Sequence, residues 1–292
     1  MNESVSMIVP VYNAMPYFPM FLESLCEQTW RPLECIFADD GSTDGSAEFL
    51  AEFMPKLREA GIVVKCLSLP HGGQAAAVNA ALKEVHGEFL TWCDSDDRMM
   101  PRCVEAKVLY LREHPEIGMV RNDGLVFDGD TGTVLSHSAK EADRKTQWIF
   151  DGLLDQTVYC YAGCYMVRMD VFLQGYPDRE IPLSPEGQNL QLLLPSASRT
   201  QCGFIPEVLH HYYRRSTGHS GRARSFTENR DRAMNFIDLT RRILDHCECD
   251  REVYEKKLEE LRKTRMEQLK YSLLLRAKEE IRNHESRNSD LP

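Results

Sequence analysis

Three carboxylates stand close together where an apolar run of the sequence ends. Residues 89–93 predict a short buried strand, and Asp94, Asp96 and Asp97 follow it directly. Like charges at this spacing raise one another's pKa unless a cation lies among them, and Mg²⁺ and Mn²⁺ take oxygen ligands. Because ligands of open α/β sheets bind at the carboxyl ends of the strands, we expect a site here for a divalent cation, Mn²⁺ or Mg²⁺, that neutralises a phosphate-bearing ligand. The alternative is that Asp96 and Asp97 cap the helix that begins near Pro101.

The elements that position these carboxylates alternate between strand and helix. Apolar runs predict four strands, at residues 5–11, 33–38, 62–69 and 89–93, and the apolar residues between them have helical spacing. This alternation predicts βαβ units, and therefore an α/β fold whose sheet is mostly parallel and flanked by helices. Right-handed crossovers bring the loops after all four strands to one edge of the sheet. Tyr12, Asp40, Gly73 and Asp96 can therefore meet there.

The rest of the chain divides into a second α/β part and a charged helical part. Beyond Pro101 the pattern predicts a helix to about His114, and then strands at 117–127 and 163–167, a hairpin partner at 133–135, a helix at 190–194 and a strand pair at 202–205 and 208–213. From Phe226, two helical stretches, about 226–247 and 250–284, carry dense charge. We expect the apolar stripe of the second stretch to pack within the chain rather than in a coiled-coil dimer. Its members are Tyr254, Leu258, Leu261, Leu269 and Leu273.

Composition limits the class of function. The 292 residues are 42% hydrophobic and 27% charged, and the formal net charge of −10 argues against a nucleic-acid partner. The chain starts directly into a strand and has no apolar stretch near the roughly 18 residues of a membrane span, so we expect a cytoplasmic protein. The Arg and Lys residues of the C-terminal helices leave two alternatives open, a peripheral contact with the inner face of the membrane and a homodimer through these helices.

Four short motifs of the first hundred residues resemble a known family. They are Val-Pro-Val-Tyr-Asn at 9–13, Asp-Asp-Gly-Ser-Thr-Asp at 39–44, Gly-Gly at 72–73 with Asn79, and Asp-Ser-Asp-Asp at 94–97. In order and spacing these motifs resemble the family-2 inverting glycosyltransferases of the GT-A fold. The resemblance implies a GT-A domain over residues 1–221, with a nucleotide-binding half at about 4–101 and an acceptor half at 102–221. Residues 222–292 lie outside it as a C-terminal helical extension.

The resemblance implies roles for individual residues. In that family the positions that match Pro10, Tyr12 and Asp40 hold the nucleoside, and those that match Asp94, Ser95 and Asp96 hold the ribose and the metal, with Asp96 as the direct ligand. Gly73 is either part of the donor site or a plain helix-entry loop. His219, in a polar loop, is a candidate for the donor phosphates, and Arg214, Arg215 and Arg222 could pair with phosphate oxygens. Asp39 and Asp44 are interpreted as structural.

The sequence departs from the family's pattern at the catalytic base. An inverting transfer needs a carboxylate that takes the acceptor proton, and the family carries it in a Glu-Asp pair just before an amphipathic helix. Gln188 and Asn189 match those two positions, and amides are not bases at neutral pH. Glu186 is the nearest acid on the same loop. It is either the displaced base or an exposed loop carboxylate.

The resemblance implies a metal-dependent, inverting glycosyltransferase of the hexosyltransferase type. It would transfer a sugar from a nucleotide-sugar donor, with UDP as the expected nucleotide, to a glycan or lipid-linked acceptor of the cell envelope or of a polysaccharide. The amides at Gln188 and Asn189 motivate an alternative, a catalytically impaired protein that binds nucleotide sugars. A third hypothesis is a nucleotidyltransferase. Such an enzyme normally has a glycine-rich loop with a basic residue directly after the first strand, and residues 12–16 do not provide one.

Overall fold

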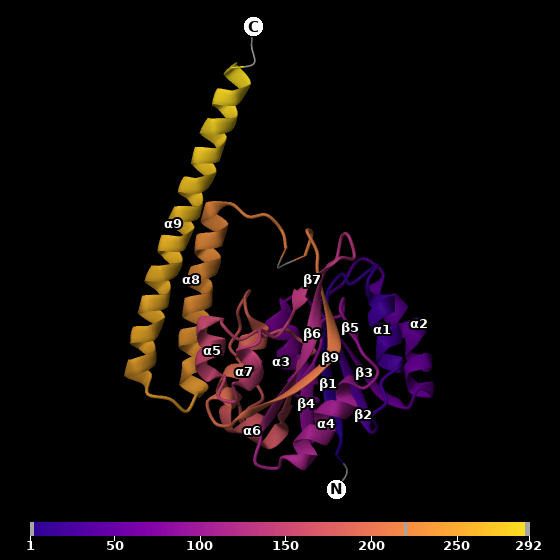
Figure 1. Cartoon of the computed structure of the whole chain (residues 1–292). Coiled ribbons are helices and arrows are strands. Elements are labelled where there is room, and N and C mark those ends of the chain that lie inside the picture. Colours follow the sequence, from indigo (N-terminus) through magenta and orange to yellow (C-terminus); the bar gives the residue numbers. More distant parts are fainter. Residues whose placement is uncertain (1–2, 219–220, 290–292) are drawn as a thin grey trace.

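The computed structural model describes residues 3–218 and 221–289, and in it a nine-stranded sheet carries helices on both faces. The strand order is β3-β2-β1-β4-β8-β6-β9-β5, and β7 pairs with β6 beside this path. Two long helices, α8 and α9, stand next to the sheet domain as an arm (Figure 1).

The first half of the chain builds the predicted βαβ units. Strands β1 (Val5–Val11), β2 (Leu33–Asp39), β3 (Ile62–Ser68) and β4 (Phe89–Trp92) are parallel to their neighbours. Helices α1 (Phe18–Cys26), α2 (Ser46–Glu59) and α3 (Gln74–Leu82) connect them. The loops after β1, β2 and β4 therefore lie at one edge of the sheet, as the sequence predicts.

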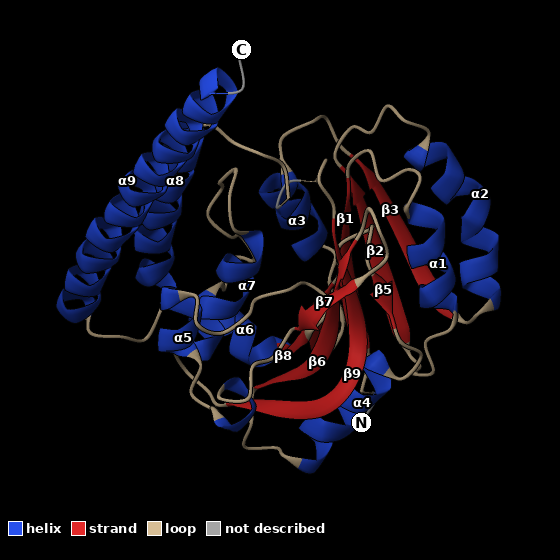
Figure 2. Cartoon of the chain, turned by 45° about the horizontal axis from the view of Figure 1, so that its top comes forward, coloured by secondary structure: helices blue, strands red, loops and turns tan. Residues whose placement is uncertain are grey.

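The second half of the sheet is mixed rather than parallel. Strand β8 (Tyr165–Arg168) runs antiparallel to β4 and to β6 (Met119–Asp128), while β9 (Cys202–Arg214) runs parallel to β6. The short β5 (Arg98–Met99) and β7 (Val134–His137) form antiparallel edges on β9 and β6. The expectation of a mostly parallel sheet therefore holds for β1–β4 and is corrected for the rest (Figure 2).

The predicted strand pair at 202–205 and 208–213 is one continuous strand, β9. Its register against β6 shifts between Asn122 and Asp123, so that Pro206 and Glu207 have no direct partner residue. A bulge accommodates a proline because the extra residue need not donate to the ladder. Propensity alone indicates a break at Pro206, and the tertiary pairing with β6 bridges it.

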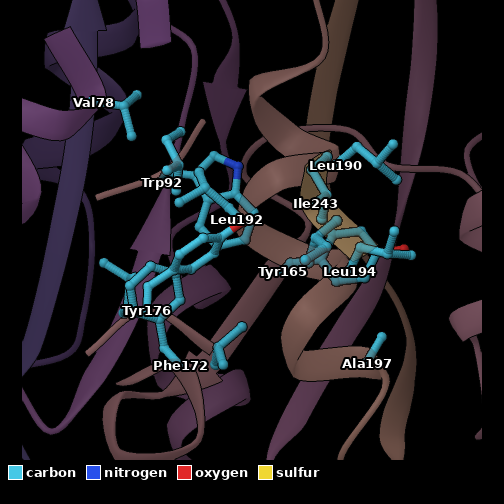
Figure 3. Packing of buried hydrophobic residues seen from close by; sticks show 14 of the residues in the cluster. Val78, Trp92, Tyr165, Phe172, Tyr176, Leu190, Leu192, Leu194, Ala197 and Ile243 are labelled. Carbon is cyan, nitrogen blue, oxygen red and sulfur yellow. The ribbon is translucent and has the colours of Figure 1, made fainter. Parts of the chain in front are cut away.

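Two hydrophobic cores lie on the two faces of the sheet. Helices α1, α2 and α4 (Cys103–Glu113) cover one face. The other face packs against α3, α5 (Phe150–Asp155), α6 (Met169–Gly175) and α7 (Gln188–Ala197). Figure 3 shows how Leu190, Leu192 and Leu194 of α7 lie among Trp92, Tyr165 and Tyr176. Helix α7, which follows the loop with Glu186, is thus fixed directly over β4 and β8.

The C-terminal helices are attached to this second core. Helix α8 (Phe226–Ile243) begins with a capping box of Ser225 and Glu228, and α9 (Arg251–Ser289) runs back beside it. Leu258 is fully buried and Tyr254 packs edge-on against Phe150, whereas Leu273 is exposed. The predicted intramolecular stripe is therefore confirmed at its beginning and ends before Leu273. Over the described ranges, no helix is long and apolar enough to cross a membrane.

Candidate active site

Asp40, the first residue after β2, organises the start of α3. Its side chain is buried and accepts hydrogen bonds from the backbone N–H of Gly72 at 2.7 Å and of Gly73 at 2.9 Å. The same carboxylate lies 2.9 Å from Nδ1 of His71. Asp40 thus ties the loop after β3 to the end of β2, and it keeps the segment 71–73 beside the edge where ligands of α/β sheets bind.

An aromatic surface lies next to this anchor. Tyr12, directly after β1, is 50% exposed and stacks on the ring of His71 at 4.4 Å between centroids. Pro10 is buried inside β1, opposite Ala38 of β2. It lies beyond Ile8, the last residue of β1 that pairs with β4, so its missing N–H removes no hydrogen bond to β4. The exposed ring of Tyr12 offers a flat face on which a nucleobase could stack. Sequence reasoning missed His71, although it directly precedes the Gly-Gly motif.

The beginning of α3 connects this surface to the acidic cluster. Gly73 caps the helix with φ 89°, and a Cβ there would meet no atom within 4 Å, so the backbone faces open space. This conformation is one that glycine adopts readily and other residues rarely do. The next residue, Gln74, donates a hydrogen bond from Nε2 to Asp94 Oδ1 at 3.2 Å. Residues 71–74 therefore contact both predicted parts of the donor site.

The acidic cluster after β4 carries one strong ion pair. Asp96 Oδ2 accepts from Arg215 Nη1 at 2.5 Å, and Arg215 also donates to the Asp96 carbonyl oxygen. The Arg215 guanidinium is buried and lies 3.6 Å from the ring centroid of Tyr17. The Asp96 side chain is still 42% exposed, so one side of it remains open. Ser95, between the two acids, is buried.

Burial and mutual repulsion raise the pKa values of the acids in this cluster. Burial and the charge of Asp96 raise the pKa of Asp94 to about 7, and the hydrogen bond from Gln74 opposes this shift. Burial also raises the pKa of Asp96, against the charge of Arg215. One guanidinium thus does not relieve the local excess of negative charge.

Asp97 differs from its two neighbours because it is fully buried. Burial and the charges of Asp96 and Asp94 raise its pKa well above the usual range, while burial lowers the pKa of His210 to about 3. Asp97 Oδ1 accepts from the Tyr213 N–H, and Oδ2 lies 3.4 Å from His210 Nε2. Burial thus disfavours the charged form of both groups, which face each other beside the acidic cluster.

The alternative that Asp96 and Asp97 cap the next helix is wrong. Helix α4 begins at Cys103, its N-cap is Arg102, and no side chain caps it. The two acids instead contact β9 and the residue that follows it, far away in the sequence. The interpretation of Asp39 and Asp44 as structural is confirmed. Asp39 accepts a hydrogen bond from the Ser42 N–H, and Asp44 accepts hydrogen bonds from the Met15 and Ser46 N–H groups.

The acidic cluster fits a divalent cation that is shared with a ligand. Among the described residues no group of three or more His, Cys, Asp or Glu side chains is arranged to hold a metal alone. Asp94 and Asp96 supply carboxylate oxygens, and a cation beside them would oppose the burial and the charge of Asp96 that raise the pKa of Asp94. A site with two carboxylates matches Mg²⁺ or Mn²⁺, which are completed by substrate phosphates and water.

The predicted base region contains both the amides and the acid, but they face different neighbours. Asn189, in the first turn of α7, accepts a hydrogen bond from Trp92 Nε1 at 2.8 Å and so lies beside the end of β4. Glu186 pairs with Arg232 of α8 at 2.8 Å and is mostly buried rather than exposed. The hypothesis that Glu186 is an exposed loop carboxylate is therefore wrong. His219 lies outside the described residues.

Comparisons with known proteins agree with this architecture. The chain matches the family model described as "Glycosyl transferase family 2" over residues 6–174. The "Uncharacterized glycosyltransferase YibD" of Escherichia coli K12 is 27% identical over 259 residues, which cover 82% of this chain and 70% of the relative. "Glycosyltransferase GlyG" of Streptococcus pneumoniae is 34% identical over 114 residues, and this match spans 39% of the chain and only 36% of GlyG.

A third relative is also similar in structure. The "Poly(ribitol-phosphate) beta-N-acetylglucosaminyltransferase TarS" of Staphylococcus aureus Mu50 is 29% identical over 139 residues, or 47% of this chain and 24% of the relative. The crystal structure of TarS 1–349 in complex with UDP-GlcNAc has a TM-score of 0.63 at 19% identity, covering 88% of this chain and 71% of that one. The mannosyltransferase PcManGT of Pyrobaculum calidifontis, in complex with GDP-Man and Mn²⁺, has a TM-score of 0.56 at 16% identity over 84% of this chain and 65% of that one. The chain therefore belongs to glycosyl transferase family 2, a family of glycosyltransferases with the GT-A fold.

Proposed function

We propose that this protein transfers a sugar from a UDP-linked donor to an acceptor hydroxyl, with inversion at the anomeric carbon and with the help of Mn²⁺ or Mg²⁺. One observation carries the proposal. Residues 71–74 connect the base-binding surface of Tyr12 and Asp40 with the acidic cluster at Asp94, through the contacts of His71, Gly73 and Gln74. A nucleoside and its diphosphate need two such parts side by side.

Each part has a role in the proposed reaction. Tyr12 stacks on the base, and Asp40 keeps the loop with Gly73 close to the donor. Asp94 and Ser95 bind the ribose side, and His219 contacts the phosphates. Asp96 would hold the Mn²⁺ or Mg²⁺ ion directly, and the ion would supply positive charge that stabilises the leaving diphosphate.

Glu186 is our proposed base. The acceptor oxygen forms a bond to the anomeric carbon, the bond from that carbon to the UDP oxygen breaks, and the proton of the acceptor hydroxyl goes to the Glu186 carboxylate. In the structure Arg232 pairs with this carboxylate, so its reach to the acceptor depends on the loop 182–187. This ion pair, with the amide at Asn189, favours a second candidate function, a donor-binding protein with impaired turnover.

The acceptor is proposed to be a glycan or a lipid-linked glycan of the cell envelope or of a polysaccharide. The name of TarS, a poly(ribitol-phosphate) beta-N-acetylglucosaminyltransferase, supports a polymeric acceptor. We propose that the enzyme works in the cytoplasm, at the inner face of the membrane. The exposed Tyr271, Leu273 and Leu274 of α9 are the surface on which we place the peripheral contact or a homodimer. Light scattering of a Leu273→Glu, Leu274→Glu variant tests the dimer.

The experiment that tests the function is hydrolysis of a panel of nucleotide sugars with Mn²⁺. The wild type, Asp96→Ala and Glu186→Gln are compared, and donor binding is measured by calorimetry in parallel. Slow release of UDP by the wild type, lost in both variants, is the expected result. Donor binding without release, abolished by Asp96→Ala, supports the second candidate. Absence of binding by every nucleotide sugar contradicts both.

A further inference from the structure

A cavity of about 470 Å³ lies between the loop before α7 and the paired helices α8 and α9. It is lined by Glu186 and Gly187 of the loop, Arg232 and Phe236 of α8, and Arg265 and Gln268 of α9. All of these residues lie outside the segment 6–174 that matches the family model, whereas Gln156 of the cavity wall lies inside it. None of residues 71–74, which we assign to the donor site, lines the cavity.

The charges around the cavity are not balanced. Arg232 is paired with Glu186 at 2.8 Å. Arg265 lies 4.8 Å from the ring centroid of Phe236 and donates a hydrogen bond to the neutral side chain of Gln156. Its buried Nε makes no hydrogen bond, and no carboxylate of the described residues lies within ion-pair distance of it. Among the described residues, Arg265 of the cavity wall thus has no carboxylate that pairs with it.

A partly desolvated guanidinium without an anion is unfavourable. Burial lowers the pKa of Arg265, and no opposite charge among the described residues counteracts this shift. A buried cation is stabilised when an anion pairs with it and accepts its hydrogen bonds. Arg265 lines the cavity together with the neutral side chains of Gln268 and Ser272, so an anion in the cavity could reach its guanidinium. The chemistry of the lining therefore selects an anionic ligand.

The position of the cavity relates this anion to the acceptor. Gly187 lines the cavity, and two residues later Asn189 bonds to Trp92 of β4, the strand that leads to Asp94. Gly187 and Asn189 are two residues apart at the start of α7. At a rise of 1.5 Å per helical residue, this part of the cavity wall therefore lies within about 5 Å of Asn189. Tyr12, Asp40 and His71 of the proposed nucleoside surface do not line the cavity, whereas Glu186, the proposed base, does. A molecule in the cavity would thus lie beside the proposed base, where the acceptor hydroxyl must come.

We propose that this cavity binds an anionic group of the acceptor, a phosphate or a carboxylate, and that Arg265 is the side chain that pairs with it. The assignment of the bound group to the acceptor rests on the proposed function. The assignment of a negative charge to it rests on the cavity and its charges alone. It assigns the C-terminal helices a role in substrate choice, because α9 supplies the cation.

Binding of inorganic phosphate to the full chain tests the proposal. Thermal unfolding is followed at increasing phosphate, with UDP and Mn²⁺ saturating the donor site and with ionic strength kept constant by chloride. We expect the midpoint temperature to rise saturably in the wild type. Arg265→Gln should weaken the apparent affinity by about tenfold, the typical effect of one hydrogen-bonded ion pair. Arg262→Gln, an exposed arginine of the same helix that pairs with Glu259, is the matched control and should behave as the wild type.

A second variant protects the test against loss of folding. Gln268 is an exposed residue of the cavity wall, so Gln268→Glu should fold normally and repel the anion. Acetate replaces phosphate in a parallel series, which distinguishes a carboxylate from a phosphate site. A saturable shift with either anion, weakened by Arg265→Gln and Gln268→Glu but kept by Arg262→Gln, supports the proposal. No saturable shift, or one that both cavity variants retain, overturns it. UDP binding, measured separately, reports on the proposed function alone.

Discussion

Arg215 and Asp96 form an ion pair of 2.5 Å at the residue where we propose a divalent cation. The guanidinium is buried against Tyr17, so it approaches Asp96 from the protein side and leaves the other side of the carboxylate exposed. The two cations are therefore compatible, and Arg215 positions Asp96 rather than replacing the metal. This relationship joins the end of β9 to the end of β4, the two halves of the sheet.

Replacing Arg215 should make the protein depend on the cation. Arg215→Gln leaves Asp94 and Asp96 without a positive neighbour, and we expect a loss of about 2 kcal/mol of unfolding free energy, reduced from the value for a fully buried pair because Asp96 is partly exposed. Mn²⁺ should restore part of this loss. The measurement is thermal unfolding with Mn²⁺ and with EDTA, and the exposed neighbour Arg214→Gln is the control. An equal Mn²⁺ effect in both variants would contradict the role of Arg215.

Gly73→Ala should weaken UDP binding through the backbone. Gly73 has φ 89° and an extended ψ, a conformation in which a side chain is strained by about 1–3 kcal/mol although the space is empty. Relief of this strain would move the amide that Asp40 holds. Gly132→Ala places a similar strain, at φ 75°, in the turn between β6 and β7. Calorimetry with UDP should show a loss of about tenfold or more for Gly73→Ala and no change for Gly132→Ala.

Asn189→Asp should rescue a protein that lacks Glu186. Asn189 accepts a hydrogen bond from Trp92 with its side-chain oxygen, and a carboxylate can accept the same bond, so the variant should fold. In the Glu186→Gln background the new acid restores a base close to β4, and we expect a gain on the order of 10²-fold in sugar transfer or donor hydrolysis. Gln188→Glu in the same background is the comparison. If neither double variant gains activity, the amide positions do not reach the acceptor.

Asp97→Asn should change how stability depends on pH. The pKa of Asp97 is raised in the folded state, so its contribution to stability is present below about pH 4 and is lost as the pH rises towards the folded value. The pKa of His210 is lowered to about 3, so its contribution is lost as the pH falls below 6.5, in both proteins. The advantage of Asp97→Asn over the wild type should therefore grow above pH 4, by up to about 1.4 kcal/mol per unit. Urea unfolding at pH 5 and pH 7 with EDTA measures it. A constant difference would show that Asp97 is ionised.

Leu258→Ala should destabilise the whole protein and not only the helical arm. Leu258 is fully buried where α9 joins the core over α7, and deletion of such a side chain costs about 2–5 kcal/mol. Val253→Ala, at an exposed residue of the same helix, should change the unfolding free energy by less than about 0.5 kcal/mol. Unfolding is followed by far-UV circular dichroism and by tryptophan fluorescence. Two separate transitions in Leu258→Ala would mean that the arm unfolds independently.

The amino-acid sequence by itself determined the βαβ half of the fold and the edge at which its loops meet. Strand and helix periodicity are local properties, and right-handed crossovers then decide where Tyr12, Asp40 and Asp94 lie. The same local pattern gave α7 and the two C-terminal helices. The resemblance to the family, rather than the local pattern, marked Gln188 and Asn189 as the positions at which that family carries its base.

Only the tertiary structure decided which distant residues neutralise or support these side chains. The pairing of Arg215 with Asp96, of His210 with Asp97 and of Glu186 with Arg232 depends on which strands and helices become neighbours. These contacts join segments separated by 119, 113 and 46 residues, and no local pattern specifies them. The mixed second half of the sheet and the bulge at Pro206 have the same cause. Burial in the finished fold raises the pKa values of Asp94, Asp96 and Asp97, and it leaves Nε of Arg265 without a hydrogen-bond partner among the described residues.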